Sequence, residues 1–233
     1  SRARALLAKR SSMKRKWFGI SALIVLLLLA ACSVNRGNSA LLRGKLVVPE
    51  EGTYYKKQLE AIERDSLSAI PYTNWRQFRT AFFKCRLANP SNLGVPLKTT
   101  LELTKAANGS YEVDAAKLAY DILERDYTSI AAHAALSKNL SIYPTVREFH
   151  EAVKNALVKS IVNSGDGKSP ETAMYVIGVA EEYEALQELG LTQESQRLEQ
   201  KNNRHYDVFA ARDSTGEKRD VYFAVDEFYG MFY

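Results

Sequence analysis

The segment 13–33 constrains the fold most, because it removes a long apolar stretch from the part of the chain that can build a domain. Three basic residues at 14–16 precede fifteen uncharged residues at 17–31. A helix of that length rises about 22 Å, which is short of the roughly 30 Å hydrocarbon core of a bilayer. The basic start, the length and the small residues at the end are typical of a secretory signal peptide. We therefore expect residues 13–31 to be a signal peptide and not a membrane span.

The rest of the sequence then divides into three further parts. Residues 1–12 precede Met13 and are predicted to be a disordered, over-long start that takes no part in the fold. Residues 32–49 are mostly polar at first and contain glycine, which is typical of a tether. Residues 50–233 have the length of one ordinary domain, and we expect a single helical domain that ends in a β-hairpin.

The end of the signal peptide carries a more specific pattern. Leu29-Ala30-Ala31-Cys32 resembles the lipobox of bacterial lipoproteins. The resemblance implies cleavage between Ala31 and Cys32, with a diacylglyceryl group on the Cys32 thiol and an acylated new amino terminus. Each buried CH₂ of such chains contributes about 0.8 kcal/mol to membrane binding. The non-acidic Ser33 implies, by the same resemblance, sorting to the outer membrane. No acidic cluster of the kind that marks surface export follows in residues 33–43, so a position facing the periplasm is expected. The alternative is an ordinary signal peptide with a chance cysteine.

Charge and cysteine content exclude two classes of protein. The whole sequence has a net charge of +5, but residues 1–31 hold seven basic and no acidic side chains. The remainder has 25 basic and 27 acidic residues, a net charge of −2, so no nucleic-acid partner is expected. Cys32 and Cys85 are the two cysteines of the sequence. With Cys32 lipidated, no internal disulfide can form, and Cys85 is expected to be a buried small apolar residue.

The spacing of apolar residues predicts a mainly α fold of antiparallel helical hairpins with a C-terminal β-hairpin. Asn74 is a candidate N-cap, and Ser169-Pro170-Glu171 resembles a helix start. A turn at 213–216 should join the two strands. The predicted helices are 54–70, 75–88, 97–107, 113–126, 128–140, 144–163, 169–189 and 192–200, and the predicted strands are 206–211 and 220–226.

One pair of these helices has a small-residue face. Ala116, Tyr120, Ala131 and Ala135 resemble the small and aromatic positions of a tetratricopeptide helical hairpin. The resemblance covers one repeat, and no second copy follows at a fixed period. It implies tetratricopeptide-like packing without a true repeat array.

Several patterns resemble chemical motifs but lack an essential residue. Residues 165–169, Gly-Asp-Gly-Lys-Ser, resemble a phosphate-binding loop, but that motif needs a glycine where Val162 stands. His150-Glu151 resembles the start of a zinc-protease helix, but Lys154 occupies the place of the second histidine. His133, His150 and His205 lie on separate predicted elements, so only the fold could assemble them. We expect no metal and no cofactor.

The run 181–184, Glu-Glu-Tyr-Glu, is densely acidic and is followed by Glu188. Glu181 and Glu184 share a helix face, and paired carboxylates can perform acid–base chemistry when they are held about 5–9 Å apart. Exposed acidic faces are common on helices, so we expect these side chains to be solvated.

The second half of the chain carries a further pattern, formed by 164–167, Ala173, Val176, Ile177, 181–183, Leu198, Tyr206, Asp207, Tyr222 and Phe223. This pattern resembles the bacterial lipoprotein family known as domain of unknown function 4919, which is common in Bacteroidetes. The resemblance covers residues 71–223 and implies a helical domain with a terminal hairpin and no assigned activity. The residues that form the candidate functional cluster are Asp166, Glu181, Glu182, Tyr183, Tyr206 and Asp207.

Two classes of function remain open. The first is a lipid-anchored interaction scaffold, which presents a surface to an envelope protein or peptide at the outer membrane. The second is an envelope hydrolase or ligand-binding protein that uses Asp166, Glu181, Glu182 and Asp207. Acids that converge with a histidine in one deep pocket would favour the second. The sequence contains no recognisable catalytic set, so we expect the scaffold and assign no catalytic residue.

Overall fold

Helix α7 (Pro144–Val162) contacts both the helical part of the domain and the first strand of the sheet. The computed structural model describes residues 50–88, 103 and 112–229, and residues 48–233 form one compact unit. The predicted signal peptide, the predicted lipobox and the predicted tether lie outside the described residues. The predicted helix 97–107 also lies outside them, apart from the buried Leu103.

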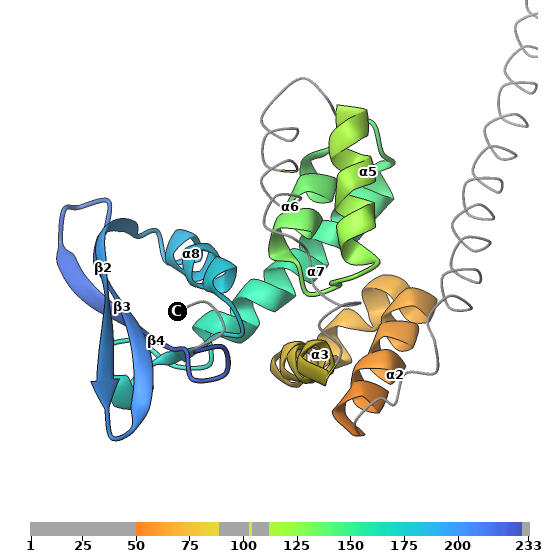
Figure 1. Cartoon of the computed structure of the whole chain (residues 1–233). Helices are drawn as coiled ribbons and strands as arrows, with labels where there is room; N and C mark the ends of the chain where they lie inside the picture. The colour runs from red at the N-terminus through yellow and green to blue at the C-terminus, as the bar shows by residue number, and fades with distance from the viewer. Residues whose placement is uncertain (1–49, 89–102, 104–111, 230–233) are drawn as a thin grey trace, which may run out of the picture. The chain divides into compact units, whose positions relative to one another are not determined.

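Six α-helices occur in the described part of the chain. Helix α7 contacts α3, α6 and α8, and it runs from the α5–α6 pair toward the sheet (Figure 1). Its buried residues recur at helical spacing from His150 to Ile161, which explains how one helix contacts several neighbours. The other helices are α2 (Glu50–Asp65), α3 (Trp75–Ala88), α5 (Glu112–Leu123), α6 (Ile130–Lys138) and α8 (Val179–Glu188).

Helix α3 has the predicted bounds and the predicted N-cap. The Asn74 side-chain oxygen accepts a hydrogen bond of 3.0 Å from the Gln77 backbone N–H. Phe78 and Phe82 are fully buried and pack against the ring of Tyr55 on α2. The aromatic side chains of α3 are therefore part of the hydrophobic core.

Helices α5, α6 and α7 pack as successive hairpins. Ser129 caps α6 by accepting a hydrogen bond of 3.3 Å from the Ala132 N–H. Ala116 is buried in the α5–α6 pair, whereas Tyr120 is substantially exposed. The edge of the Tyr120 ring contacts His150, so it does not fill the buried aromatic position of a tetratricopeptide hairpin.

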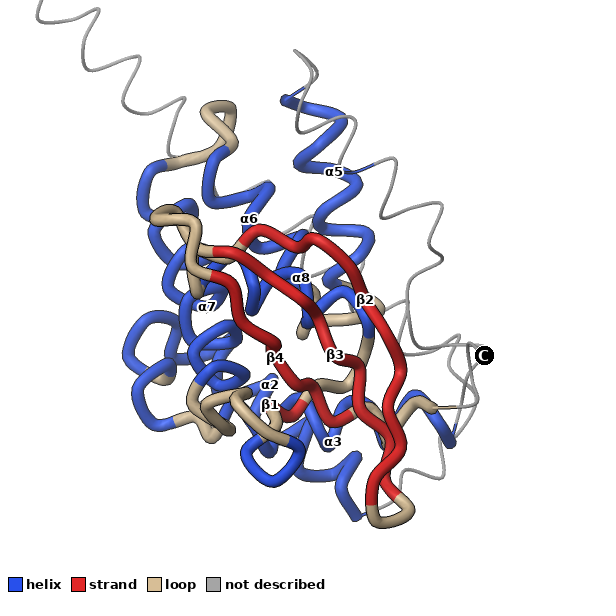
Figure 2. The backbone as a smooth tube through the Cα atoms, turned by 90° about the vertical axis from the view of Figure 1, so that its left-hand side faces the viewer, coloured by secondary structure: helices blue, strands red, loops and turns tan. Residues whose placement is uncertain are grey.

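The C-terminal half contains a four-stranded mixed sheet in the order β1-β4-β3-β2. Strand β1 runs parallel to β4, and the other pairs are antiparallel. Helices lie behind the sheet in Figure 2, and α8 covers that face, where Tyr183 packs edge-on against Phe209. The strands are β1 (Met174–Tyr175), β2 (Thr192–Lys201), β3 (Arg204–Arg212) and β4 (Lys218–Ala224).

The prediction of a mainly α fold with a terminal hairpin is wrong, because the described residues form a mixed α/β domain. The largest error is segment 192–200, predicted as a helix, which forms strand β2. Its Gln, Glu, Arg and Lys residues are good helix formers and show no alternation, since nearly all its side chains are exposed. Pairing with β3 overrides that propensity. Asn202 and Asn203 both have positive φ, at 51° and 62°, which suits a two-residue hairpin turn.

The predicted helix 169–189 is also wrong over its first half. A short 3₁₀ helix (Pro170–Thr172) and strand β1 precede α8, which begins at Val179. Ser169 makes no capping hydrogen bond. The glycines of loop 165–169 allow a close approach: a Cβ on Gly165 would lie 2.3 Å from the Thr172 carbonyl oxygen. The Gly167 N–H donates to the Thr172 carbonyl and the Tyr222 N–H donates to the Gly167 carbonyl, so this loop packs as a turn against β1 and β4.

Candidate functional site

Two of the predicted acids of α8, Glu181 and Glu182, are buried, which contradicts the solvated face expected for them, whereas Glu184 is half-buried and Glu188 is exposed. Arg79 on α3 is fully buried and forms an ion pair with Glu181 at the start of α8. The same Glu181 carboxyl oxygen accepts a hydrogen bond of 2.9 Å from the Ile177 backbone N–H. Arg79 also donates to the Tyr175 carbonyl oxygen at 3.2 Å. One buried guanidinium thus joins α3 to both β1 and α8.

A second layer of contacts surrounds this ion pair. The guanidinium of Arg76 lies 5.1 Å from the centre of the Tyr175 ring, and Thr80 donates to the Tyr175 hydroxyl at 3.3 Å. Arg76 is exposed, so its contact is a weak cation–π interaction. The Tyr175 contacts hold the strand end in place beside α3.

The second acid pair lies between α8 and the sheet. Glu182 is fully buried, and Asp207 on β3 is 1% exposed. None of the described residues donates a hydrogen bond to either carboxyl oxygen of Glu182. Gln196 on the neighbouring strand donates to Asp207 at 3.1 Å. We call Arg79, Glu181, Glu182 and Asp207 the α8 carboxylate cluster.

The environment of Glu182 keeps its carboxyl group protonated at neutral pH. Burial, followed by the negative charge of Asp207 and a hydrogen bond to it, raises the pKa of Glu182 to about 9. A protonated Glu182 donates its hydrogen bond to Asp207, which accounts for the contact between two acids. Such a pair resembles an acid–base dyad chemically, but the near-complete burial of both residues leaves a substrate no access to it.

The other predicted cluster members lie elsewhere. Asp166 is exposed in loop 165–169, where it accepts the Lys168 N–H at 3.0 Å. Tyr206 is buried on the opposite face of β3, in a small cluster with Val208 and Ala224. Tyr183 is exposed on the surface of α8. The structure thus brings Glu181, Glu182 and Asp207 to one region and leaves Asp166 and Tyr206 outside it.

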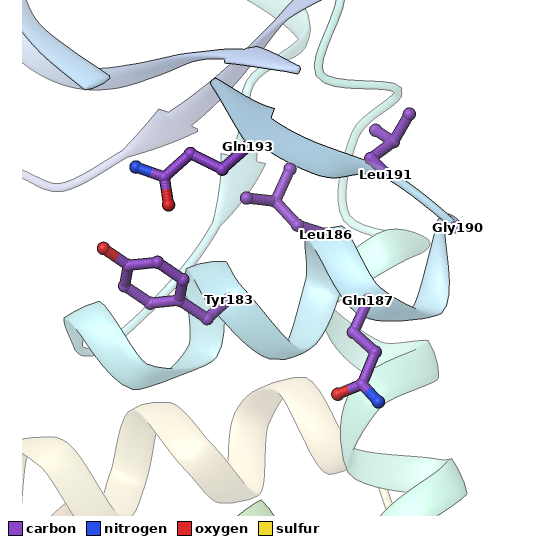
Figure 3. A pocket seen from close by; sticks show the side chains of 6 residues that line it. All are labelled: Tyr183, Leu186, Gln187, Gly190, Leu191 and Gln193. Atoms are coloured by element: carbon purple, nitrogen blue, oxygen red, sulfur yellow. The ribbon is translucent and has the colours of Figure 1, made fainter. Parts of the chain in front are cut away.

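A shallow pocket of about 330 Å³ lies beside the cluster and does not reach it. Figure 3 shows the Tyr183 hydroxyl and the Gln193 amide near each other at one side of the pocket, with the Leu186 side chain to their right. Its lining is mostly neutral, and neither Glu182 nor Asp207 contributes to it. The residues that line it are Tyr183, Leu186, Gln187, Gly190, Leu191 and Gln193.

The fold assembles two of the three histidines. His133 and His150 are buried, with 2.9 Å between their Nδ1 atoms, and His133 Nε2 donates to the Tyr127 carbonyl at 3.0 Å. That bond fixes the neutral tautomer of His133, so its Nδ1 accepts from the Nδ1–H of His150. Burial, aided by the neighbouring His150, lowers the pKa of His133 to about 3, and burial lowers that of His150 to about 4. His205 stacks separately on Tyr229.

Sequence reasoning missed Arg79 although a signal was present. Arg79 stands in the same helical stripe as Trp75 and Phe82, four residues after one and three before the other. A charge inside an apolar stripe must find a buried partner.

In the described residues, no group of three or more His, Cys, Asp or Glu side chains could hold a metal ion. Cys85 is buried, as expected.

Comparison with known proteins gives one match. Residues 102–230 match the family described as domain of unknown function (DUF4919). The chain belongs to this family. No curated protein and no solved structure matches the chain. The DUF4919 match begins after α3, so Arg79 comes from outside the matched region and binds Glu181 inside it.

The described residues contain no helix that is both long and apolar enough to cross a membrane.

Replacing Arg79 should destabilise the domain strongly. We expect Arg79→Met to lower the free energy of unfolding by about 3–5 kcal/mol, because it leaves the Glu181 charge buried without its partner. The double variant Arg79→Met with Glu181→Gln should recover part of that loss. Arg76→Met, one turn away on α3 and exposed, is the matched control and should change stability by under about 1 kcal/mol. Urea unfolding measures all three, and an Arg79→Met loss no larger than the control would contradict the assigned role.

Stability should peak near pH 6.5. The pKa of Glu182 is raised from 4.5 to about 9, so native Glu182 holds a proton that the unfolded chain releases, and stability falls as pH rises from about 4.5 to 9. The histidine pair has lowered pKa values, so stability rises with pH from about 3 to 6.5. Each group contributes a slope of up to roughly 1.4 kcal/mol per pH unit.

Glu182→Gln separates these contributions. It should flatten the decline above pH 6.5, because the amide cannot lose a proton. It should also steepen the rise between about pH 4.5 and 6.5, because the Glu182 slope opposes that of the histidines there. Glu188→Gln on the same helix is exposed and serves as the control. Denaturant unfolding from pH 4 to 9 is the measurement, and an alkaline decline that persists in Glu182→Gln would contradict the assignment.

Proposed function

We propose that this protein is a lipid-anchored cell-envelope scaffold that binds a protein or peptide at the outer membrane, on the periplasmic side. The proposed anchor is the lipid on Cys32, and the proposed signal cleavage lies between Ala31 and Cys32. The observation that carries the scaffold role is strand β2. It spans ten residues at the edge of the sheet, and its side chains are exposed at every position except the half-buried Glu199.

An open sheet edge of this length is suited to binding another chain. Along its outer side, β2 pairs with no other described strand, so its outward backbone N–H and C=O groups are available to an added strand. Strand addition uses main-chain hydrogen bonds for affinity and alternate side chains for specificity. The register irregularity between Gln193 and Ser195 leaves 195–201 as the regular stretch. This segment is the proposed interaction edge.

The alternative is an envelope hydrolase or ligand-binding protein. The observation that favours it is the proton-sharing contact of Glu182 with Asp207, because a carboxyl pair of unequal acidity is a common acid–base device. Both groups are buried under α8, the pocket does not reach them, and no histidine joins them. Asp166 lies outside that contact. The scaffold therefore accounts for more of the arrangement.

The anchor is tested by replacing Cys32. We expect the native chain to fractionate with outer membranes and to incorporate labelled palmitate, because acyl chains hold a protein on a bilayer. Cys32→Ala should lose the label and remain uncleaved or become soluble. Cys85→Ala is the matched control and should behave as the native chain does. Palmitate labelling that persists in Cys32→Ala would overturn the proposed anchor.

The interaction edge is tested by photocrosslinking in the native host. A photoreactive amino acid at Gln200 on β2 should give discrete crosslinked species, because an added strand lies within reach of that side chain. The same probe at Tyr72, which is 89% exposed and lies far from β2 in sequence, is the control. Crosslinks that are the same from both positions, or absent from both, would argue against a scaffold that uses this edge.

A further inference from the structure

We infer that the partner on strand β2 is a second copy of this chain, paired antiparallel about a two-fold axis at Leu198. This inference rests on the proposed role of β2 as the interaction edge and names its occupant. The arrangement would join two sheets into one, with the two β2 strands at its centre. Symmetry, the length of the regular strand and the charges along it together limit the pairing register of the two β2 strands.

Symmetry leaves few possible registers. Two identical antiparallel edges are related by a two-fold axis perpendicular to the sheet, and directly opposed side chains must lie on the same face. A residue on the axis therefore faces its own copy, and its neighbours pair at equal distances on either side. Each register is then specified by the residue on the axis.

The Leu198 register gives the longest regular overlap. It pairs 195–201 with itself and begins after the irregularity between Gln193 and Ser195. Registers centred on Ser195 or Gln196 run through that irregularity. A register centred on Gln200 overlaps only residues 199–201 within the strand, because β2 ends at Lys201.

Charge excludes the two remaining long registers. A register centred on Arg197 places two guanidinium groups opposite each other on the axis. A register centred on Glu199 opposes two carboxylates there, and it also opposes Arg197 to Lys201. Like charges directly across a sheet are destabilising. In the Leu198 register, Arg197 instead faces Glu199 of the partner subunit, and symmetry makes this pair twice.

The charges next to the axis already form a ladder within one chain. Arg197 contacts Asp220 on β4 at 2.7 Å and Glu199 at 2.8 Å. These side chains are about one-third to two-fifths exposed, so they are able to contact an incoming strand. Adding the partner subunit's Glu199 extends the ladder from Asp220 through Arg197 across the axis. Arg197 then bridges three carboxylates that border one face of the sheet.

The other face places an apolar contact on the axis. Leu198 is 43% exposed although the rest of β2 is polar. Pairing about Leu198 brings the two leucines together and opposes Gln196 to Gln200 of the partner subunit. The leucine that is exposed in one copy becomes covered by its own counterpart, which explains a single apolar residue on a polar edge.

Cysteine crosslinking tests the register directly. The test uses the full chain with Cys32→Ala, in which the buried Cys85 is the remaining native cysteine. Directly opposed residues have Cα atoms about 4.5–5.5 Å apart, within the range of a disulfide. Leu198→Cys should therefore form a disulfide-linked dimer on mild oxidation, at least tenfold faster than Tyr72→Cys.

A mixture gives a stricter test of the same register. Gln196→Cys and Gln200→Cys should crosslink when mixed, but neither should crosslink alone, because each lies roughly 14 Å from its own copy. Efficient crosslinking of either one alone, or failure of Leu198→Cys to exceed the Tyr72→Cys rate, would overturn the Leu198 register.

Charge reversal tests the energetic basis. Arg197→Glu and Glu199→Arg should each weaken dimerisation by on the order of tenfold or more, since each creates two like-charge pairs across the axis. The double variant should regain most of that loss, because it restores the two pairs with their signs exchanged. Arg197→Glu and the double variant share the same repulsion with Asp220, so their comparison isolates the contact between copies. Sedimentation equilibrium measures the dimer, and urea unfolding verifies each fold.

Failure of this inference and failure of the proposed function are distinguishable. If the Gln200 probe traps another envelope protein while Leu198→Cys does not crosslink, the scaffold proposal is retained and the pairing with a second copy is rejected. If neither the probe nor the cysteines trap any chain, both fall. A dimer that is unaffected by either charge reversal would also overturn pairing through β2.

Discussion

The buried ion pair of Arg79 with Glu181 is the interaction on which the arrangement of the domain depends. It connects α3, which precedes the DUF4919 match, to α8 inside that match. A guanidinium that is fully removed from water is stable only when its charge and hydrogen bonds are satisfied. Here the Glu181 carboxylate binds Nη1 and the Tyr175 carbonyl binds Nη2, while Nε has no hydrogen-bond partner among the described residues. The pair therefore fixes where α8 begins relative to the helices before it.

The position of α8 in turn determines the chemistry of the next residue. Because Glu181 faces α3, Glu182 is directed toward the sheet, where it meets Asp207 under full burial. One acid is neutralised by an arginine and the other by a proton, which are the two ways in which a protein buries a carboxyl group. Glu181 and Glu182 thus connect α8 to α3 on one side and to the sheet on the other. Their burial distinguishes them from the acids of an accessible active site.

The sequence allowed the helices to be located where apolar spacing is strong, as in α3 and α7. It failed where tertiary pairing decides the structure. Strand β2 has helix-forming residues and no alternation, so only its pairing with β3 makes it a strand. For the site, the acids at Glu181, Glu182 and Asp207 were identified but their burial was not, because their partners are remote in sequence. Arg79 is 102 residues from Glu181.

The polar residues of strand β2 bear on both the secondary-structure prediction and the proposed pairing of two copies. An edge strand rich in Gln, Glu, Arg and Lys is normally expected to resist pairing with another chain, because charged side chains disfavour the addition of a strand. Protection, however, depends on like charges meeting in every accessible register. In β2 the order Arg197-Leu198-Glu199 is self-complementary about its centre, so the charges oppose the wrong registers and favour one. The residues that misled the secondary-structure prediction are thus the ones that would make this edge selective for its own copy.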